Sequence, residues 1–149
     1  MMIQKDLLFR KIEKDDFNKY YLQLLQHLSI IQPNEISIQQ FNHFVENLTT
    51  NHSIFIIEDT SSQSIIGSIT LLIEDKIIHN MGKVGHIEDV VVHPAYRGQQ
   101  LGKILVEKVI EIAKQMNCYK VILDCQDKNK VFYEKCCFEH KGNQMSKYF

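Results

Sequence analysis

The chain has 149 residues, 44% of them hydrophobic, which is enough to bury one core and gives no reason to expect two domains. Its 17 Lys and Arg are balanced by 18 Asp and Glu, so no overall positive field would recruit nucleic acid or an anionic membrane. No segment approaches the roughly 18 apolar residues of a membrane span, and the charged N-terminus lacks a signal-peptide core. We therefore expect one cytoplasmic domain, residues 1–149, with no nucleic-acid or membrane partner.

The first third of the sequence predicts a strand followed by two amphipathic helices. Residues 7–12, LLFRKI, form a short β-type run. Asp15 or Asp16 can cap a helix whose apolar residues recur at intervals of three and four up to residue 28. Ser37 and Gln40 form a capping-box pattern, which predicts a second helix reaching residue 48.

The middle of the chain predicts the sheet. β-branched runs at 53–58 and 64–74, separated by a polar turn cluster, are typical of an antiparallel hairpin. The unbroken apolar end of residues 86–92 indicates a strand covered on both faces, which we expect to be central. Residues 101–116 repeat apolar side chains at helical spacing, so a helix should pack back on the sheet.

The last third predicts shorter elements. Residues 119–125 indicate a second buried strand, 128–136 a short helix, and 138–149 a closing strand or hairpin. The four cysteines lack CxxC spacing and the seven histidines are scattered. We therefore expect reduced thiols and no metal site.

Residues 97–103, RGQQLGK, leave the predicted strand and open the predicted helix. The first amides of a helix have no intrahelical partner, and the positive end of the helix dipole points with them toward an anion. Gly98 and Gly102 would let the backbone approach a diphosphate closely, and Arg97 and Lys103 add positive charge. Neither a Walker loop nor a Rossmann fingerprint is present. The turn therefore indicates a diphosphate site, the alternative being a plain strand-to-helix connection.

This turn resembles the pyrophosphate motif of the GNAT superfamily of acyl-CoA N-acyltransferases, Arg/Gln-x-x-Gly-x-Gly/Ala. Arg97 and Gly102 match the motif, and Gln100 stands where Gly is usual. The blocks GHIEDVVV, RGQQLGK, NCYKVILDC and NKVFYEKCCF resemble, in that order, the glucosamine-6-phosphate N-acetyltransferase family. The resemblance implies an α/β (α+β) single-domain GNAT fold: a mixed, mostly antiparallel central sheet with a splayed pair of parallel strands, flanked by about four helices. It also implies acetyl-CoA as co-substrate, no metal, and a homodimer with a shared substrate site.

The resemblance also implies where the cofactor binds. The strand backbone would pair with the pantetheine arm as though it were another strand. Asn129 would hydrogen-bond the amide-bearing arm, and the Tyr133 hydroxyl would face the thioester sulfur. The implied cofactor-binding residues are Val90, Val91, Val92, Arg97, Gly98, Gln99, Gln100, Leu101, Gly102, Lys103, Asn129 and Tyr133.

Acetyl transfer to an amine needs an acceptor for the ammonium proton and a donor for the departing thiolate. The amine should titrate near roughly 8, so a strong base is unnecessary. Pleat alternation sends Glu88 and Asp89 to opposite faces. We expect Glu88 to accept the proton, directly or through water, and Asp89 to bind the sugar or support the strand. Tyr133, with a pKa of about 10, could donate to a thiolate of about 8.5. The alternatives are structural carboxylates and an ordinary helix-face aromatic.

The sugar phosphate is assigned by resemblance alone, with some residues donated by a second subunit. Lys120 is the preferred phosphate partner, and His79 is a binding residue rather than the base. Where such enzymes often present Arg near the C-terminus, this chain has Tyr148, so Lys147 would supply the charge. The implied substrate-binding residues are Ser29, Lys76, Ile77, Ile78, His79, Glu88, Asp89, Tyr119, Lys120, Asp124 and Tyr148.

The expected reaction is direct attack of the amine of D-glucosamine 6-phosphate on acetyl-CoA within a ternary complex, in UDP-N-acetylglucosamine biosynthesis. A first alternative is a GNAT enzyme acting on another amine, such as a polyamine, peptide or lysine. Lys76 and Lys120 would disfavour such cationic acceptors. A second alternative is a non-catalytic acyl-CoA-binding domain, against which Glu88 and Tyr133 argue.

Overall fold

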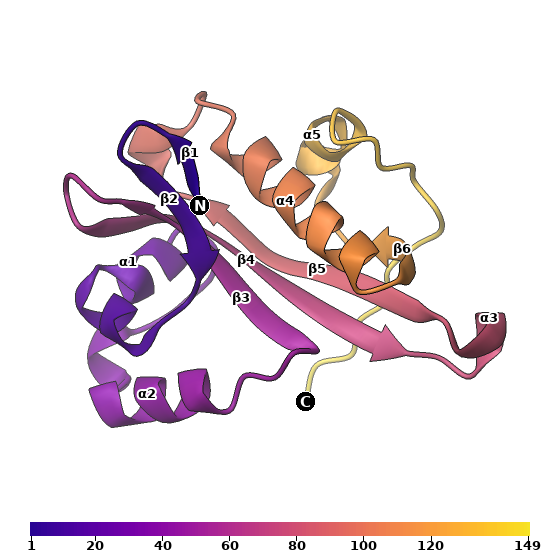
Figure 1. Cartoon of the computed structure of the whole chain (residues 1–149), viewed down its shortest axis with the longest axis horizontal. Coiled ribbons are helices and arrows are strands. Elements are labelled where there is room, and N and C mark those ends of the chain that lie inside the picture. Colours follow the sequence, from indigo (N-terminus) through magenta and orange to yellow (C-terminus); the bar gives the residue numbers. More distant parts are fainter.

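The computed structural model describes residues 1–149 and contains one six-stranded sheet in the order β1-β2-β3-β4-β5-β6 (Figure 1). Neighbouring strands are antiparallel except β5 and β6, which are parallel. The strands are β1 (Met2–Gln4), β2 (Leu7–Lys11), β3 (His52–Asp59), β4 (Ser64–Asp75), β5 (Lys83–Val92) and β6 (Cys118–Ile122). The helices are α1 (Tyr21–Leu25), α2 (Ile38–Glu46), α3 (Ile78–Met81), α4 (Leu101–Gln115) and α5 (Lys130–Glu134), with 3₁₀ turns η1 (Lys14–Asn18), η2 (Pro33–Glu35), η3 (Pro94–Tyr96) and η4 (Asp127–Asn129).

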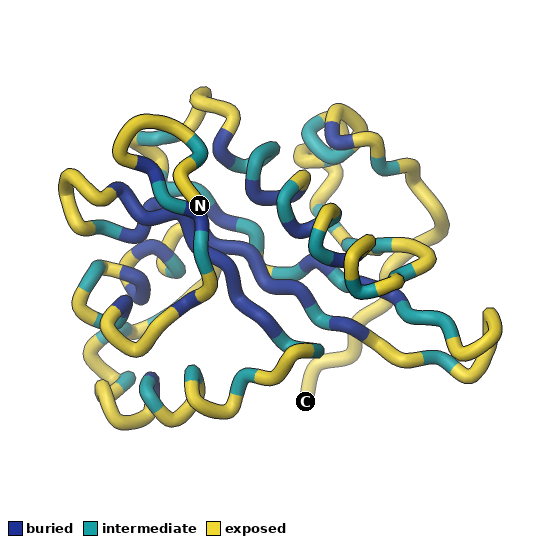
Figure 2. Tube along the Cα trace, in the orientation of Figure 1, coloured by how far each residue is buried: buried dark blue, intermediate teal, exposed yellow.

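Two hydrophobic cores lie on opposite faces of the sheet. The larger joins Phe55 and Ile57 to the apolar face of α4, and the smaller joins Ile54 and Ile56 to α1 and α2. Successive side chains of β3 thus alternate between the two cores, as the pleat requires. Figure 2 shows the buried residues running along β3, β4, β5 and the sheet-facing side of α4. Helices therefore cover both faces of the sheet, α4 on one face and α1 with α2 on the other.

Several predicted elements are confirmed. β3 and β4 form the expected antiparallel hairpin, and α4 begins at the predicted residue. α2 begins with the predicted capping box: the Ser37 amide donates to Gln40 Oε1 at 2.8 Å, and the Gln40 amide donates to Ser37 Oγ at 3.2 Å. Local hydrogen-bonding chemistry is enough to specify this start.

The predicted helix from residue 15 to 28 was wrong as a single element. It is divided into η1 and α1, with Tyr20 between them at a left-handed φ of 62°. Asp16 does not cap a helix from outside: it is fully buried, and its oxygens accept from Arg10 Nη1 and Nη2 at 2.8 and 2.6 Å. This ion pair fixes η1 against β2, so a tertiary contact rather than helical periodicity decides the local structure.

Three further predictions about strands need correction. β5 is the fifth of six strands rather than central. β6 is an exposed edge strand rather than a buried one, with Tyr119 among its exposed side chains. Residues 138–149 form no strand or hairpin, and the side chains of Met145, Tyr148 and Phe149 are almost fully exposed. Because no later strand pairs with β6, its outer edge stays open.

Candidate active site

The parallel strands β5 and β6 separate partway along their length. Their pairing runs from Lys83 opposite Cys118 to His86 opposite Ile122, where β6 ends. β5 continues to Val92. The edge of residues 87–92 that faces away from β4 therefore has no neighbouring strand. Such an edge presents backbone donors and acceptors that an extended ligand can pair with.

A β-bulge shapes β5 at this opening. Thr70 pairs with Glu88 and Ser68 with Val91, so β5 contains one residue more than β4 over this interval. Asp89 has a left-handed φ of 51°. The expectation that simple pleat alternation separates Glu88 from Asp89 was wrong in its reasoning, because a bulge breaks that alternation.

The two carboxylates nevertheless act on different neighbours. Burial and then the charge of Asp89 raise the pKa of Tyr21, in α1, to about 12. The charge of Glu88 contributes instead to the raised pKa of Tyr133, in α5. Glu88 is therefore close to Tyr133 in α5, and Asp89 is close to Tyr21 in α1.

Glu88 is half-buried, and burial raises its pKa above the ordinary value. The carboxylates of Asp124 and Asp89 raise the pKa further, while His86 lowers it. A carboxylate with a raised pKa holds a proton more readily, which suits it to accept one from an ammonium group.

Tyr133 remains protonated throughout the physiological range. Burial raises its pKa to about 12, with smaller contributions from Cys125, Cys136, Asp124 and Glu88. Its hydroxyl makes no hydrogen bond within the chain, while its ring packs between those of Phe132 and Phe138. The ring is thus fixed and the hydroxyl is free to donate.

The turn before α4 presents a run of unpaired amides. None of the six N–H groups from Gly98 to Lys103 donates a hydrogen bond within the chain. The first bond of the helix runs from the Ile104 amide to the Gln100 carbonyl at 3.0 Å. With the dipole of a 15-residue helix behind them, these amides form a cradle for an anion.

The backbone conformation of Gln100 explains why glycine is usual at this position of the motif. It adopts a left-handed φ of 61° at the N-cap of α4, a conformation that costs a non-glycine residue about 1–2 kcal/mol. Glycine therefore suits this position for its backbone conformation.

A contact that the sequence did not reveal ties this turn to the β3–β4 hairpin. The Tyr96 hydroxyl donates to Asp59 Oδ2 at 2.7 Å, and Ser61 donates to Asp59 Oδ1 through its amide at 2.9 Å and its hydroxyl at 2.6 Å. These bonds lower the pKa of Asp59 to about 2, and the bond from the Ser61 hydroxyl contributes most. The Asp-x-Ser spacing could have predicted the turn around Asp59, but nothing local indicates Tyr96.

The residues expected to bind the sugar phosphate do not all converge within one chain. Asp124 is close enough to Glu88 and Tyr133 to raise the pKa of both. His79, Tyr119 and Lys120 gather instead at the far end of β5, where the His79 and Tyr119 ring centroids are 4.4 Å apart. Lys120 pairs with Val84, about 13 Å along the strand from Glu88.

The remaining expected residues lie outside both groups. Lys76 forms an ion pair with Glu74, whose other oxygen is 3.0 Å from His86 Nε2. Ile77 and Ile78 are exposed at the tip of the β4–β5 hairpin, where α3 is a turn with left-handed φ at its last three residues rather than a regular helix. Ser29 is exposed after α1, and Tyr148 lies in the exposed C-terminal segment.

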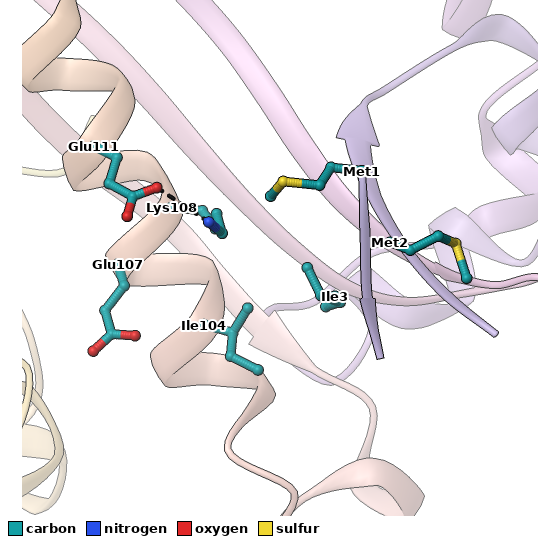
Figure 3. Close-up of a pocket in the computed structure, with 7 residues that line it drawn as sticks. All are labelled: Met1, Met2, Ile3, Ile104, Glu107, Lys108 and Glu111. Carbon is teal, nitrogen blue, oxygen red and sulfur yellow. Dashed lines mark hydrogen bonds and ion pairs between the residues drawn. The ribbon is translucent and has the colours of Figure 1, made fainter. Parts of the chain in front are cut away.

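A separate hollow of about 300 Å³ lies between β1 and α4 (Figure 3). Its charged lining is partly paired, since Lys108 Nζ is 3.1 Å from Glu111 Oε2. None of its lining residues belongs to the opening between β5 and β6.

All four cysteines are free, and no group of three or more His, Cys, Asp or Glu is placed to hold a metal ion. No helix is long and apolar enough to cross a bilayer.

A sheet whose parallel strands diverge beside a bulge, with an amide-lined helix start at the mouth of the opening, defines an acyl-CoA N-acyltransferase. The sequence profile of the Acetyltransferase (GNAT) family matches residues 9–138, and the chain belongs to that family. Its acetyl donor is therefore acetyl-CoA. The predicted mixed sheet with one splayed parallel pair is confirmed.

Relatives of known name match nearly the whole chain. The glucosamine 6-phosphate N-acetyltransferase of Arabidopsis thaliana is 44% identical over 143 residues, covering 94% of this chain and 95% of the relative. Glucosamine 6-phosphate N-acetyltransferase 1 of Dictyostelium discoideum is 40% identical over 148 residues, covering 99% and 94%. The crystal structure of the Arabidopsis protein matches with a TM-score of 0.92 at 43% identity, covering 96% of this chain and 98% of that one. The resemblance to this family is thereby confirmed.

Proposed function

We propose that the protein transfers the acetyl group of acetyl-CoA to the amine of D-glucosamine 6-phosphate, giving N-acetyl-D-glucosamine 6-phosphate and CoA. The observation that supports this is the opening between β5 and β6, which lies beside six unpaired amides, with Glu88 on β5 close enough to Tyr133 for its charge to affect the pKa of that residue. The relatives that match this chain from end to end are named for that reaction. The product would enter UDP-N-acetylglucosamine biosynthesis in the cytoplasm, with residues 1–149 acting as one domain.

The cofactor is held at two places. The amides of Gly98 to Lys103 donate to its diphosphate, and Arg97 and Lys103 add charge. The unpaired edge of Val90, Val91 and Val92 pairs with the pantetheine arm. Asn129, at the start of α5, donates to the amides of that arm. The thioester is thereby led from the helix start toward Glu88.

The chemistry then proceeds by direct attack. Glu88 accepts one proton from the ammonium group, directly or through water, and the free amine attacks the thioester carbonyl. As the C–N bond forms and the C–S bond breaks, the nitrogen loses a second proton, which leaves on the CoA sulfur. Tyr133 donates a hydrogen bond to that sulfur while it carries negative charge. Asp89 and Asp124 support the site as a strand anchor and as an acceptor for sugar hydroxyls.

The phosphate is bound with the help of a second copy of the chain. A span of about 13 Å along β5 separates the level of Lys120 from Glu88, and His79 lies farther still. The hairpin tip exposes Ile77, Ile78 and Met81 beside the open edge of β6, as expected of a surface that another subunit covers. In the homodimer Lys76, His79, Tyr119 and Lys120 complete the substrate site, with Lys147 and Tyr148 from the exposed C-terminal segment.

A panel of amines with acetyl-CoA tests this function. CoA release should be far faster with glucosamine 6-phosphate than with glucosamine, spermidine or a lysine peptide. Lys120→Gln should raise KM for the sugar phosphate, while Lys5→Gln, at an exposed lysine near the N-terminus, should not. Equal rates with the phosphorylated and unphosphorylated sugar would contradict a phosphate pocket. CoA release with none of the amines would indicate a binding domain without catalysis.

A further inference from the structure

Gly102, in the first turn of α4, lies directly against the ring of Phe132 in α5. A Cβ atom at residue 102 would be 3.2 Å from Cζ and 3.4 Å from Cε2 of that ring, and 3.8 Å from Cγ2 of Val92. At Gly98, by contrast, an added Cβ would meet nothing within 4 Å. The space that a side chain at residue 102 would need is therefore already filled by Phe132.

Phe132 in turn supports the ring of Tyr133. Their centroids are 4.9 Å apart with the planes at 72°, and Phe138 packs against Tyr133 at 6.0 Å. None of the five residues of α5 is buried, and Cys136, just after it, reaches the main core. Phe132 on Gly102 is thus a contact between α5 and the diphosphate cradle itself.

We propose that Phe132 is a positioning residue for acetyl transfer: by occupying the space over Gly102, it sets the Tyr133 hydroxyl relative to the diphosphate cradle. This rests on the proposed function, in which one cofactor molecule is held at both places. The arm between diphosphate and sulfur has a limited reach, so the two contacts must be held at a matching separation. A rigid contact between α4, which begins at the diphosphate cradle, and α5, which carries Tyr133, maintains this separation.

The absence of a side chain at Gly102 would then leave space for the ring of Phe132 rather than for the phosphate oxygens. The two roles differ in what a methyl group at this position does. If the ring needs the space, Gly102→Ala displaces Phe132 and with it Tyr133, which lowers kcat. If the phosphates need it, the same change weakens CoA binding. Gly102 has no left-handed φ and lies in a helix, where alanine is favoured, so the variant should fold.

A double-mutant cycle tests the proposal. Gly102→Ala should lower kcat roughly tenfold, since small misplacements of reacting groups are costly, while Kd for CoA by calorimetry stays within about twofold. Phe132→Leu should lower kcat similarly. The pair Gly102→Ala with Phe132→Leu should cost no more than Phe132→Leu alone, because the ring that clashes has gone. In a Tyr133→Phe background, Gly102→Ala should have no further effect on kcat.

Two kinetic or binding results would overturn the proposal: weaker CoA binding by Gly102→Ala with kcat unchanged, or a full Gly102→Ala penalty on kcat in the Tyr133→Phe background. A crystal structure of Gly102→Ala gives a readout that needs no turnover, and an unmoved Phe132 ring would also contradict it. If wild-type protein acetylates a different amine, the proposed acceptor fails. The same cycle, run with that amine, still decides the role of Phe132.

Discussion

The Tyr133→Phe substitution removes a hydroxyl whose pKa is raised to about 12, chiefly by burial. The thiol of CoA has a pKa of about 8.5, so full transfer of the tyrosyl proton to the departing thiolate would be uphill by about 5 kcal/mol. In the proposed mechanism the hydroxyl therefore acts as a hydrogen-bond donor to a charged sulfur, a contact worth about 1.5–3 kcal/mol. Its loss should lower kcat roughly 10- to 150-fold.

Steady-state release of CoA at saturating glucosamine 6-phosphate measures this effect. KM for acetyl-CoA should change by less than about twofold, because the diphosphate cradle is untouched. Tyr20→Phe is the matched control, since Tyr20 is 61% exposed and its hydroxyl makes no hydrogen bond within the chain. A Tyr133→Phe enzyme that keeps half or more of wild-type kcat would refute the role of the hydroxyl. Equal losses in both variants would attribute the effect to general destabilisation.

Glu88→Gln should lower kcat roughly 10²- to 10⁴-fold. The pKa of Glu88 is raised and wild-type activity falls as pH drops through it, so the variant should lose that acid limb of the pH–rate profile and keep only the one set by the amine, at roughly 8. An acid limb at the same position in the variant would exclude Glu88 as the base. Gln100→Gly should raise the free energy of unfolding by up to about 1 kcal/mol in thermal or denaturant melts, because glycine removes the left-handed strain. Gln99→Gly, where φ is not positive, should lower it, and a gain at both positions would contradict this explanation. Asp59→Asn should destabilise the protein at neutral pH but progressively less in acid. The pKa of Asp59 is lowered in the folded state, so its contribution is present above the unfolded value of 3.8 and is lost as pH falls through about 2. A stability difference that stays constant down to pH 2, or one matched by Asp75→Asn at an exposed carboxylate, would contradict the assignment.

Elements that depend on neighbouring residues were predictable from the sequence. The α2 capping box joins residues only three apart, and the apolar spacing of α4 specifies both its type and its buried face. The run of unpaired amides before α4 was predictable for the same reason, because unpaired amides are a property of every helix start. The family resemblance added the splayed strands, which no periodicity indicates.

Features that depend on distant residues were not predictable. Tyr96 and Asp59 are 37 residues apart, and the half-buried Arg10 of β2, which pairs with Asp16, is also bonded to Glu58, 48 residues away. The bulge at Asp89 arises from pairing with β4, and β6 is exposed because residues 138–149 add no strand beyond it. In each case tertiary contacts override a local pattern that would otherwise favour a longer helix or a regular, buried strand.

A crystal structure with CoA and N-acetylglucosamine 6-phosphate bound would test the proposed site most directly. We predict diphosphate oxygens within hydrogen-bonding distance of amides between Gly98 and Lys103, the sulfur beside the Tyr133 hydroxyl, and the acetylated nitrogen beside Glu88. A cofactor bound elsewhere, with those amides unoccupied, would contradict the site, and so would a sugar nitrogen distant from Glu88.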